Sequence, residues 1–535
     1  MVRRRNEEYL MSPADQAAGG APAQSVRLVI SAVAVTLLLS SLGQTIVSAA
    51  LPVIVGQLGG LEHLTWVVIA YLLSSTVVAP IYGKLGDLYG RKIVLQAAIL
   101  IFLVGSILSA MANSMTFLIV ARAIQGLGGG GLMVVAMTVV ADVIPARERG
   151  RIQGVFSAVF GVSTIAGPLL GGFIVEHLAW QWIFLLNLPV GAFALLVISL
   201  VLKPRTERVK RSIDYLGFVL LTAALTSFVL ATSLGGNTWA WTSPQIIGLV
   251  VASVILIGAF LFVEHRAAEP VLPLMLFRNN TFSVFNSVAF LVGMAMFGSI
   301  TFIPMYLQLA KGVSPTSSAI QLIPMMVGMI GASMSSGLLM TRTGRYRFLP
   351  RISTFILTIA LILLGFMQLD TPTWQVTIYM LMVGIGIGPV NSVSVTTTQN
   401  AVPRHLVGVA TAGTTLFRQI GGSIGVSVFG AIFVAGLAGS LGNLLPGGAA
   451  ASAISGEFVA SLPEDLRGQV LEAVASALHP VFYFGAAASG LAFLLTFVAE
   501  ELPLASSNRL QPKPEASASA GGPVVAATAP ASPDR

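Results

Sequence analysis

The sequence predicts an all-α polytopic membrane protein with fourteen transmembrane helices, and three observations carry this prediction. Only 9% of the 535 residues are charged, where a soluble domain carries about 25%. Hydrophobic residues make up 55% of the chain and the mean hydropathy is +0.87, so most of the outer surface must face lipid. Fourteen apolar stretches are each long enough to cross a hydrocarbon core of ~30 Å.

The apolar stretches form two sets of six with two more between them. The first set lies at about 28–50, 64–83, 93–112, 116–141, 151–175 and 182–202, within several residues at each boundary. The middle pair lies at about 215–235 and 245–264. The second set lies at about 282–308, 317–340, 350–369, 374–398, 410–436 and 480–500.

These stretches predict five regions along the chain. We expect residues 1–26 to form a cytoplasmic tail, 27–203 a six-helix bundle, 204–280 a linker with two extra spans, and 281–504 a second six-helix bundle. Residues 505–535, rich in Ala, Ser and Pro, predict a disordered cytoplasmic tail. Inside the second bundle, the spacing of apolar residues in the outer loop 437–479 predicts a short amphipathic helix on the outer face; these residues are Leu466, Val470, Val474 and Leu478.

Charged and aromatic residues predict the orientation. Cytoplasmic loops collect Lys and Arg, and with both tails placed inside, only Lys311 and Arg467 of the loop cations fall outside. The six Trp all fall at outer ends of predicted spans, where their rings prefer the headgroup level. We therefore expect a multi-pass protein of the plasma (inner) membrane with cytoplasmic termini, in which the net charge of +8 reflects topology and not nucleic-acid binding.

An internal repeat relates the two sets of six. The segment from Gly83 to Arg91 aligns with the segment from Gly337 to Arg345 at an offset of 254, and the two share G-x-L-x-x-x-x-G-R. Farther along, Pro145 with Gly150 aligns with Pro403 and Gly408 at an offset of 258. Duplicated helical halves with a binding site at their interface are the architecture of secondary transporters.

The loop from Gly83 to Lys92 resembles the loop signature G-x-L-a-D-r-x-G-r-k of the major facilitator superfamily. Within that superfamily the chain resembles the fourteen-helix drug:proton antiporter group, which includes QacA-like and EmrB-like exporters. The resemblance implies multidrug efflux of hydrophobic or amphipathic small molecules by alternating access, with the proton gradient as energy source and no cofactor. It implies the lipid bilayer and small-molecule substrates as partners, allows a membrane-fusion adaptor protein as another, and gives no role to nucleic acid.

The two loop copies are expected to gate the carrier. In the first copy, the glycines permit close helix approach, and Asp87 can accept hydrogen bonds from a helix N-terminus and pair with an Arg. The resemblance implies that this cluster latches the cytoplasmic side and breaks when the carrier changes state; the alternative is a loop that only sets topology. The expected gating residues are Gly83, Asp87, Gly90, Arg91, Gly337, Gly344 and Arg345.

Polar residues deep in apolar helices predict the substrate or proton path. Arg122 and Gln125 share one helical face and resemble the fourth-helix motif l-x-x-x-R-x-x-q-G. A buried Arg needs a partner or a wet cavity; the alternative for Arg122 is snorkelling to the outer surface. Arg418 lies about ten residues from the inner end of its helix. Two roles are alternatives for this region, helix packing by its small residues and contact with a ligand. The expected path residues are Gln44, Arg122, Gln125, Asp142, Arg418 and Gln419.

The fifth span contains a glycine- and proline-rich run that resembles the exporter motif G-x-x-x-G-P-x-x-G-G. Pro168 lacks an N–H and should kink the helix, while the glycines thin its packing face. The alternative is a glycine-rich packing helix of any bundle. The motif residues, which favour export over import, are Gly167, Pro168, Gly171 and Gly172.

One departure from the resemblance concerns the first span. Gly43 stands where the family pattern l-D-x-T-I-V-n-x-A-L-P has an Asp that is a leading candidate for proton exchange. No other acidic residue lies deep in a predicted span, so Asp142 becomes the best proton carrier and Glu176 beside His177 the next. Two deep arginines, Arg122 and Arg418, then predict an electropositive cavity that prefers neutral or anionic amphiphiles to dicationic drugs.

Other function classes fit the sequence less well. An intramembrane enzyme would need clustered polar residues within the bilayer, yet all five His lie in loops or at helix ends, and there are 0 Cys. No Walker A motif is present, so ATP is not the direct energy source. A channel, a non-transporting receptor, a carrier not coupled to protons, and a dedicated exporter of one lipid, sugar or siderophore-like metabolite are the alternatives.

Overall fold

A computed structural model describes residues 23–59, 63–202, 214–236, 238–267, 269–309, 311–313, 315–441 and 464–504. Fourteen helices in these ranges are long and apolar enough to cross a membrane, which confirms the predicted number. Apart from one isolated bridge between Gly235 and Trp239, the described ranges contain no β-structure. The tail 505–535, most of the tail 1–26 and the middle of the loop 437–479 lie outside the described residues.

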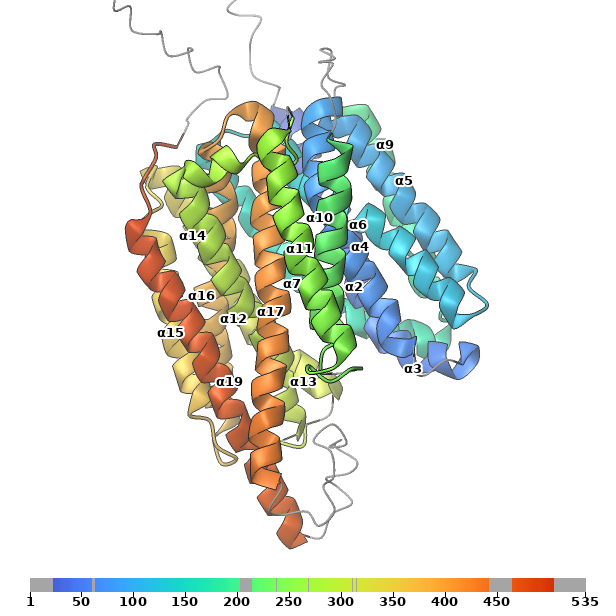
Figure 1. The fold of residues 1–535 in the computed structure, drawn as a ribbon, viewed down its shortest axis with the longest axis vertical. Helices are drawn as coiled ribbons and strands as arrows, with labels where there is room; N and C mark the ends of the chain where they lie inside the picture. The colour runs from blue at the N-terminus through green and yellow to red at the C-terminus, as the bar shows by residue number, and fades with distance from the viewer. Residues whose placement is uncertain are drawn as a thin grey trace, which may run out of the picture.

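The helices form two bundles that stand side by side (Figure 1). The N-terminal bundle contains α2 (Ala23–Thr45), α3 (Val47–Leu58), α4 (Leu64–Tyr89), α5 (Arg91–Ala110), α6 (Met115–Val143), α7 (Ala146–His177), α8 (Trp182–Leu185) and α9 (Asn187–Val201). The C-terminal bundle contains α12 (Asn280–Leu309), α13 (Pro315–Gln321), α14 (Ile323–Thr343), α15 (Phe348–Gly365), α16 (Thr373–Asn400), α17 (Val407–Leu441) and α19 (Glu464–Val498).

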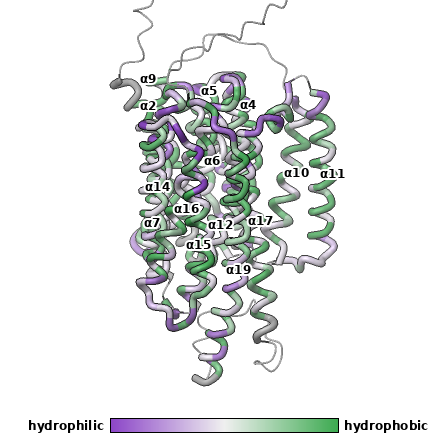
Figure 2. Tube along the Cα trace, turned by 90° about the vertical axis from the view of Figure 1, so that its left-hand side faces the viewer, coloured by the Kyte–Doolittle hydropathy of each residue, from purple (hydrophilic) through white to green (hydrophobic). Residues whose placement is uncertain are grey.

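The two extra spans form a hairpin on the outside of the bundles. Helix α10 (Tyr215–Leu234) contacts both α4 and α17, and α11 (Pro244–Arg266) packs on α10. The pair stands apart from the main body in Figure 2. Thr232 of α10 hydrogen-bonds Ser423 of α17 at 2.6 Å, so the hairpin is tied to the C-terminal bundle while it covers the line where α4 meets α17.

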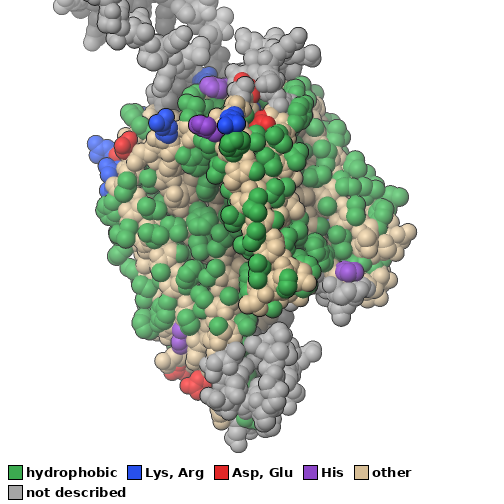
Figure 3. All heavy atoms as spheres, in the orientation of Figure 1, with side chains coloured by type: hydrophobic (Ala, Val, Ile, Leu, Met, Phe, Trp, Pro, Cys, Tyr) green, Lys and Arg blue, Asp and Glu red, His purple; other side chains and the backbone are tan. Residues whose placement is uncertain are grey.

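The surface explains why these sequences form membrane-spanning helices. On the face that Figure 3 shows, apolar side chains cover the flank, while charged side chains gather at the two ends. Helix α11 illustrates the flank, because Val250, Val254 and Ile255 are 46%, 65% and 64% exposed. Such a surface is stable only in lipid, where a helix satisfies its own backbone hydrogen bonds. We call the end that carries the α4–α5 and α14–α15 loops the inner end, and the opposite one the outer end.

Two expectations about individual helices need correction. The first predicted span, 28–50, is two helices, because regular helix is interrupted at Ile46 between α2 and α3. The predicted short helix on the outer face was wrong, because residues 466–478 belong to the same helix, α19, as the last span. Val470, Val474 and Leu478 are at most 1% exposed, so their spacing reflects packing into the C-terminal core.

Candidate functional site

A cavity of about 120 Å³ lies between the two bundles. Helices α2, α6 and α7 line it from one side, and α12, α14, α16 and α17 from the other. Most of its apolar lining consists of methionine and phenylalanine: Met133, Met137, Met296, Met329, Phe156, Phe160 and Phe297. Its polar lining consists of Ser40, Ser41, Gln44, Gln153, Ser157, Asn391, Arg418 and Gln419.

The apolar lining favours ligands of variable shape. Methionine is unbranched and polarizable, so it repacks around different ligands at low cost. Phenylalanine adds rigid apolar area that can stack on an aromatic ring. The cavity can therefore hold an apolar body without demanding one outline, while the few polar groups orient it.

Among the described residues, Arg418 is the one charged residue in this lining, and no Asp or Glu is part of it. The side chain projects from α17, eleven residues beyond the first residue of that helix, Val407. Its Nη1 donates a hydrogen bond to Oδ1 of Asn391 at 3.3 Å. The sequence predicted two arginines at the cavity, and the structure places one of them, Arg418, in its lining.

The second predicted arginine lies elsewhere. Arg122 is 1% exposed inside the N-terminal bundle and does not line the cavity. Its guanidinium donates to the carbonyl oxygens of Gly43 at 3.1 Å and Val67 at 3.3 Å, and to Oε1 of Gln125 at 2.6 Å. It also lies 4.3 Å from the ring centroid of Tyr71. These contacts satisfy the buried charge and exclude the snorkelling alternative.

The contacts of Gln125 and Gly43 show what this network does. The side-chain amide of Gln125 donates a hydrogen bond to Ser106 Oγ at 2.8 Å. The network therefore links four helices, α2, α4, α5 and α6. A Cβ atom on Gly43 would lie 2.7 Å from the ring of Phe102 and 3.8 Å from the amide nitrogen of Gln125. The position where the family has an Asp therefore faces the N-terminal bundle and not the cavity.

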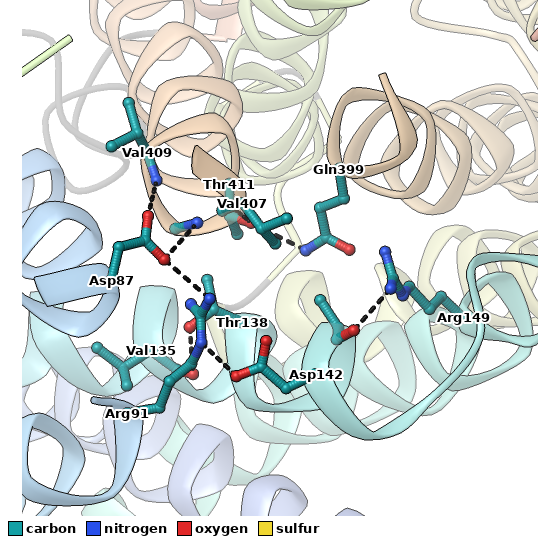
Figure 4. A network of polar contacts seen from close by, with 12 residues as sticks. Asp87, Arg91, Val135, Thr138, Asp142, Arg149, Gln399, Val407, Val409 and Thr411 are labelled. Carbon is teal, nitrogen blue, oxygen red and sulfur yellow. Dashed lines mark hydrogen bonds and ion pairs between the residues drawn. The ribbon is translucent and has the colours of Figure 1, made fainter. Parts of the chain in front are cut away.

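Asp87 joins the two bundles at the inner end. Its carboxylate accepts the backbone N–H groups of Gly408 and Val409 at 3.1 Å each, at the start of α17, and pairs with Arg91 at 2.8 Å (Figure 4). Arg91 also pairs with Asp142 at 2.5 Å. A carboxylate at a helix N-terminus is favourable because the orphan N–H groups and the helix dipole both attract it. Both expected contacts of Asp87 are therefore present, one with a helix N-terminus and one with an Arg; we call these contacts together with Asp142 the latch, and their release during transport stays a prediction.

Asp142 lies in the latch and not in the cavity. Its side chain is 52% exposed, whereas that of Asp87 is 4% exposed, with Arg91 between them. The structure therefore divides the predicted path residues into three places. Gln44, Arg418 and Gln419 line the cavity, Arg122 and Gln125 brace the N-terminal bundle, and Asp142 belongs to the inner end.

The second loop copy joins α14 to α7. Arg147 at the start of α7 donates to the carbonyl oxygens of Thr341 at 2.7 Å and Arg342 at 3.0 Å, the last turn of α14. The hydroxyl of Thr341 donates to the carbonyl of Arg147 at 3.1 Å. Gly344, with φ of +70°, ends α14 in the left-handed conformation that suits glycine. Arg345 is exposed and has no ion pair among the described residues.

Glycines at both contacts let the helices touch. A Cβ on Gly83 would lie 2.7 Å from the carbonyl oxygen of Gly408, and one on Gly337 would lie 2.2 Å from that of Gly150. The first copy begins its next helix after Gly90, whose φ of 89° suits glycine. The repeated glycines predicted from the sequence therefore meet in pairs, each glycine near the end of α4 or α14 against a glycine in the first turns of α17 or α7.

The exporter motif packs α7 against the break in the first span. A Cβ on Gly167 would lie 2.2 Å from Oγ1 of Thr45, and that hydroxyl donates to the carbonyl of Ser163 at 2.9 Å. Gly171 is buried, whereas a Cβ on Gly172 would meet open space. Pro168 lies within α7, and its side chain is outside the described residues. The motif is thus a packing surface next to Ile46.

Most cavity residues were not found from the sequence. The four methionines, three phenylalanines and the polar residues Ser40, Ser41, Gln153 and Ser157 carry no motif. Only a count of methionine within apolar spans could have drawn attention to Met133 and Met137. Among the described residues, no group of three or more His, Cys, Asp or Glu could hold a metal ion.

Comparison with known proteins gives consistent results. Residues 33–426 match the family model of the Major Facilitator Superfamily. The chain is 40% identical over 420 residues to the Multidrug transporter protein MdtP of Bacillus subtilis (78% of this chain, 76% of the relative). It is 34% identical over 475 residues to Multidrug resistance protein 3 of the same organism (86% and 92%). An uncharacterized MFS-type transporter of Mycobacterium tuberculosis is 39% identical over 491 residues (91% and 72%).

Solved structures share the fold at low sequence identity. The human organic anion transporter MFSD10 superposes with a TM-score of 0.58 at 14% identity, over 88% of this chain and 99% of that one. The proton:xylose symporter XylE superposes with a TM-score of 0.58 at 13% identity, over 90% and 97%.

Proposed function

Because the chain belongs to the Major Facilitator Superfamily, we propose that it is a secondary active exporter of hydrophobic or amphipathic small molecules, driven by proton antiport. The observation that carries this proposal is the cavity, which residues of both duplicated halves line together. A site at such an interface can be exposed to one side of the membrane and then to the other when the halves rock. We place the protein in the plasma membrane with both termini in the cytoplasm.

The lining supports a broad substrate range. Four methionines and three phenylalanines surround the cavity, and these side chains adapt to ligands of different shape. Two relatives that cover most of the chain are named multidrug proteins. A dedicated exporter of one metabolite would be expected to present more fixed polar contacts, because specificity is set by buried groups that only the right ligand satisfies.

The closed inner end supports alternating access. Gly83 meets Gly408 and Gly337 meets Gly150, so the bundles touch at both lines of contact. Arg418 lies ten residues beyond Gly408 on α17, which places the cavity about 15 Å deeper than this closure. The arrangement corresponds to an inward-closed state, and opening the inner contacts would give the cavity access to the cytoplasm.

The latch is where proton binding would act on this equilibrium. Protonation of Asp87 would remove its negative charge from the start of α17 and from Arg91, so the closed inner end would weaken. Asp142 shares Arg91 with Asp87, and its side chain is 52% exposed, so its carboxylate can exchange a proton with the surroundings, and loss of its charge would remove one of the two partners of Arg91. Asp142 therefore stays our first assignment for the proton carrier.

The decisive experiment is transport by purified protein in proteoliposomes under an imposed pH gradient, read with a panel of fluorescent amphiphiles. We expect several unrelated compounds to move, and we expect the flux to stop when the gradient is collapsed. Asp142→Asn should abolish pH-driven flux while counterflow of the same compound persists. Transport of only one metabolite class would favour the dedicated exporter, and flux that ignores the gradient would contradict proton coupling.

A further inference from the structure

Arg418 is a positive charge without a counter-charge at the centre of the molecule. In the part of the chain that the structure describes, no acidic side chain lines the cavity with it. A charged side chain at such depth costs several kcal/mol unless it is paired or reaches water. Such residues therefore mark binding sites or ion paths in membrane proteins.

The guanidinium has more donors than the protein uses. It carries five N–H groups in a planar fork, and within the described residues it makes one hydrogen bond, to Asn391 at 3.3 Å. The Asn391 amide oxygen is neutral, so it orients the side chain without cancelling the charge. The unused donors match the two oxygens of a carboxylate, which binds Arg in a bidentate way.

The other bundle offers a neutral donor to the same cavity. The hydroxyl of Ser41 on α2 is buried and has no hydrogen-bond partner among the described residues. Gln44, one helical turn farther along α2, also lines the cavity. A buried polar group without a partner is unfavourable, so a ligand that supplies an acceptor to this hydroxyl would gain a hydrogen bond at no cost to the protein's own contacts.

We infer that Arg418 forms an anion subsite that selects amphiphiles bearing one carboxylate, with Asn391 as its positioning residue and Ser41 as the facing donor. The inference rests on the proposed function and specifies its substrate class. The carboxylate lies on Arg418, and the apolar body lies among the methionines and phenylalanines. A cationic amphiphile of the same size is rejected, because it meets a like charge with no carboxylate nearby.

Equilibrium binding to the purified full-length protein tests this subsite independently of transport. The three probes share one ring system and differ in charge: 2-naphthylacetate, its methyl ester and 2-naphthylethylamine. Charge-assisted hydrogen bonds contribute about 1.5–3 kcal/mol, so the wild type should bind the carboxylate ~10- to 100-fold more tightly than the ester. The amine should bind more weakly than the ester.

Variants show which residue causes the preference for the carboxylate. Arg418→Gln should bring the carboxylate-to-ester affinity ratio to about one, and Arg418→Lys should keep part of the preference, because it retains the charge but not the fork. Arg278→Gln removes an exposed positive charge at the inner end and is the matched control, which should keep the wild-type ratio. A thermal melt of each variant excludes loss of folding as the cause.

The outcomes separate this inference from the proposed function. Equal binding of carboxylate and ester by the wild type, or a preference that survives Arg418→Gln, overturns the anion subsite. Flux of the same probes in proteoliposomes reports on export alone. Anion-selective binding without pH-driven flux would leave the subsite standing and remove the export proposal, whereas pH-driven flux without anion preference would do the reverse.

Discussion

The two inner contacts between the bundles are built from the same repeat but hold together differently. At the α4–α17 contact, Gly83 packs on Gly408 and the carboxylate of Asp87 binds the start of the facing helix. At the α7–α14 contact, Gly337 packs on Gly150, and the position equivalent to Asp87 is Thr341. Glycine packing, the steric part, occurs at both contacts, whereas a carboxylate that binds the start of the facing helix, the ionic part, occurs within the described residues only at the α4–α17 contact.

The polar groups at the two contacts also work in opposite directions. Asp87 brings a negative charge to the N-terminus of α17, whereas Arg147 brings a positive charge to the C-terminus of α14. Both arrangements complement a helix dipole. Of these two groups, only the carboxylate can gain a proton, because an arginine is already protonated. The α4–α17 contact is therefore the one that a proton can open.

The second loop has its own anchor in place of an ionic latch. The backbone N–H of Tyr346 donates to Oε1 of Glu501 at 3.0 Å, and its hydroxyl accepts the N–H of Leu502 at 2.8 Å. Burial raises the pKa of the Tyr346 phenol, so the hydroxyl stays neutral at physiological pH. The chain after α19 thus holds this loop within the C-terminal bundle, and the loop need not bind the partner bundle as tightly.

Gly337→Val tests the shared steric part and should have the largest effect. A Cβ at this position lies 2.2 Å from the carbonyl oxygen of Gly150, a backbone atom that cannot move aside by a rotamer change. Overpacking of about 3 kcal/mol would shift the population ~100-fold toward the inward-open state. Because the chain contains 0 Cys, spin labels at Glu148→Cys and Arg278→Cys report the separation of the bundles directly.

The matched control for this substitution is Gly172→Val on α7, where an added Cβ meets open space. It should leave the label distance at the wild-type value. An unchanged distance in Gly337→Val would show that the α7–α14 contact does not need close approach of the helices. The two inner contacts would then not share a requirement for glycine packing.

Asp87→Asn tests the ionic part and should have the next largest effect. Removing the charge weakens two hydrogen bonds and one ion pair, by about 2 kcal/mol in total, or ~30-fold in the open-to-closed ratio. Thr341→Val at the other contact removes one neutral hydrogen bond and should cost about 1 kcal/mol. The same spin-label pair measures both variants.

Lowering the pH makes the comparison of Asp87→Asn with Thr341→Val more specific. A proton on Asp87 removes the negative charge that binds the start of α17 and Arg91, so we expect acidification to open the inner end of the wild type. Thr341→Val should keep this pH dependence, and Asp87→Asn should remove it. A pH-dependent opening that persists in Asp87→Asn would assign the proton response to another group.

The outcome for individual residues shows which features a sequence can predict. Duplicated glycines such as Gly83 and Gly337 were found because a repeat preserves their spacing. Arg418 was found because a charge in an apolar helix is a strong signal. The same signal predicted that Arg122 lies in the substrate path. The structure instead shows its guanidinium donating to the carbonyl oxygens of Gly43 and Val67, which belong to helices distant in sequence.

The apolar lining could not have been predicted for a physical reason. In a soluble protein the buried face of a helix is its apolar face, but in lipid every face is apolar. Met133 lines the cavity and Leu196 is 57% exposed on the flank, yet both stand in continuous apolar sequence. For the same reason, the buried stripe of Val470 and Val474 was mistaken for a surface helix.

Lys84→Gln should have the smallest effect and marks the edge of the α4–α17 contact. Lys84 pairs at 3.0 Å with Glu269, which follows the α10–α11 hairpin, and the two side chains are 5% and 26% exposed. A partly exposed pair of this kind contributes up to about 1 kcal/mol, so the open-to-closed ratio should change by less than ~5-fold. Glu269→Gln should act alike, and the double variant should add little, because both changes remove the same pair. If Lys84→Gln instead changes the open-to-closed ratio as much as Asp87→Asn does, the α10–α11 hairpin is part of the latch. The ionic difference between the two inner contacts would then include these two extra helices.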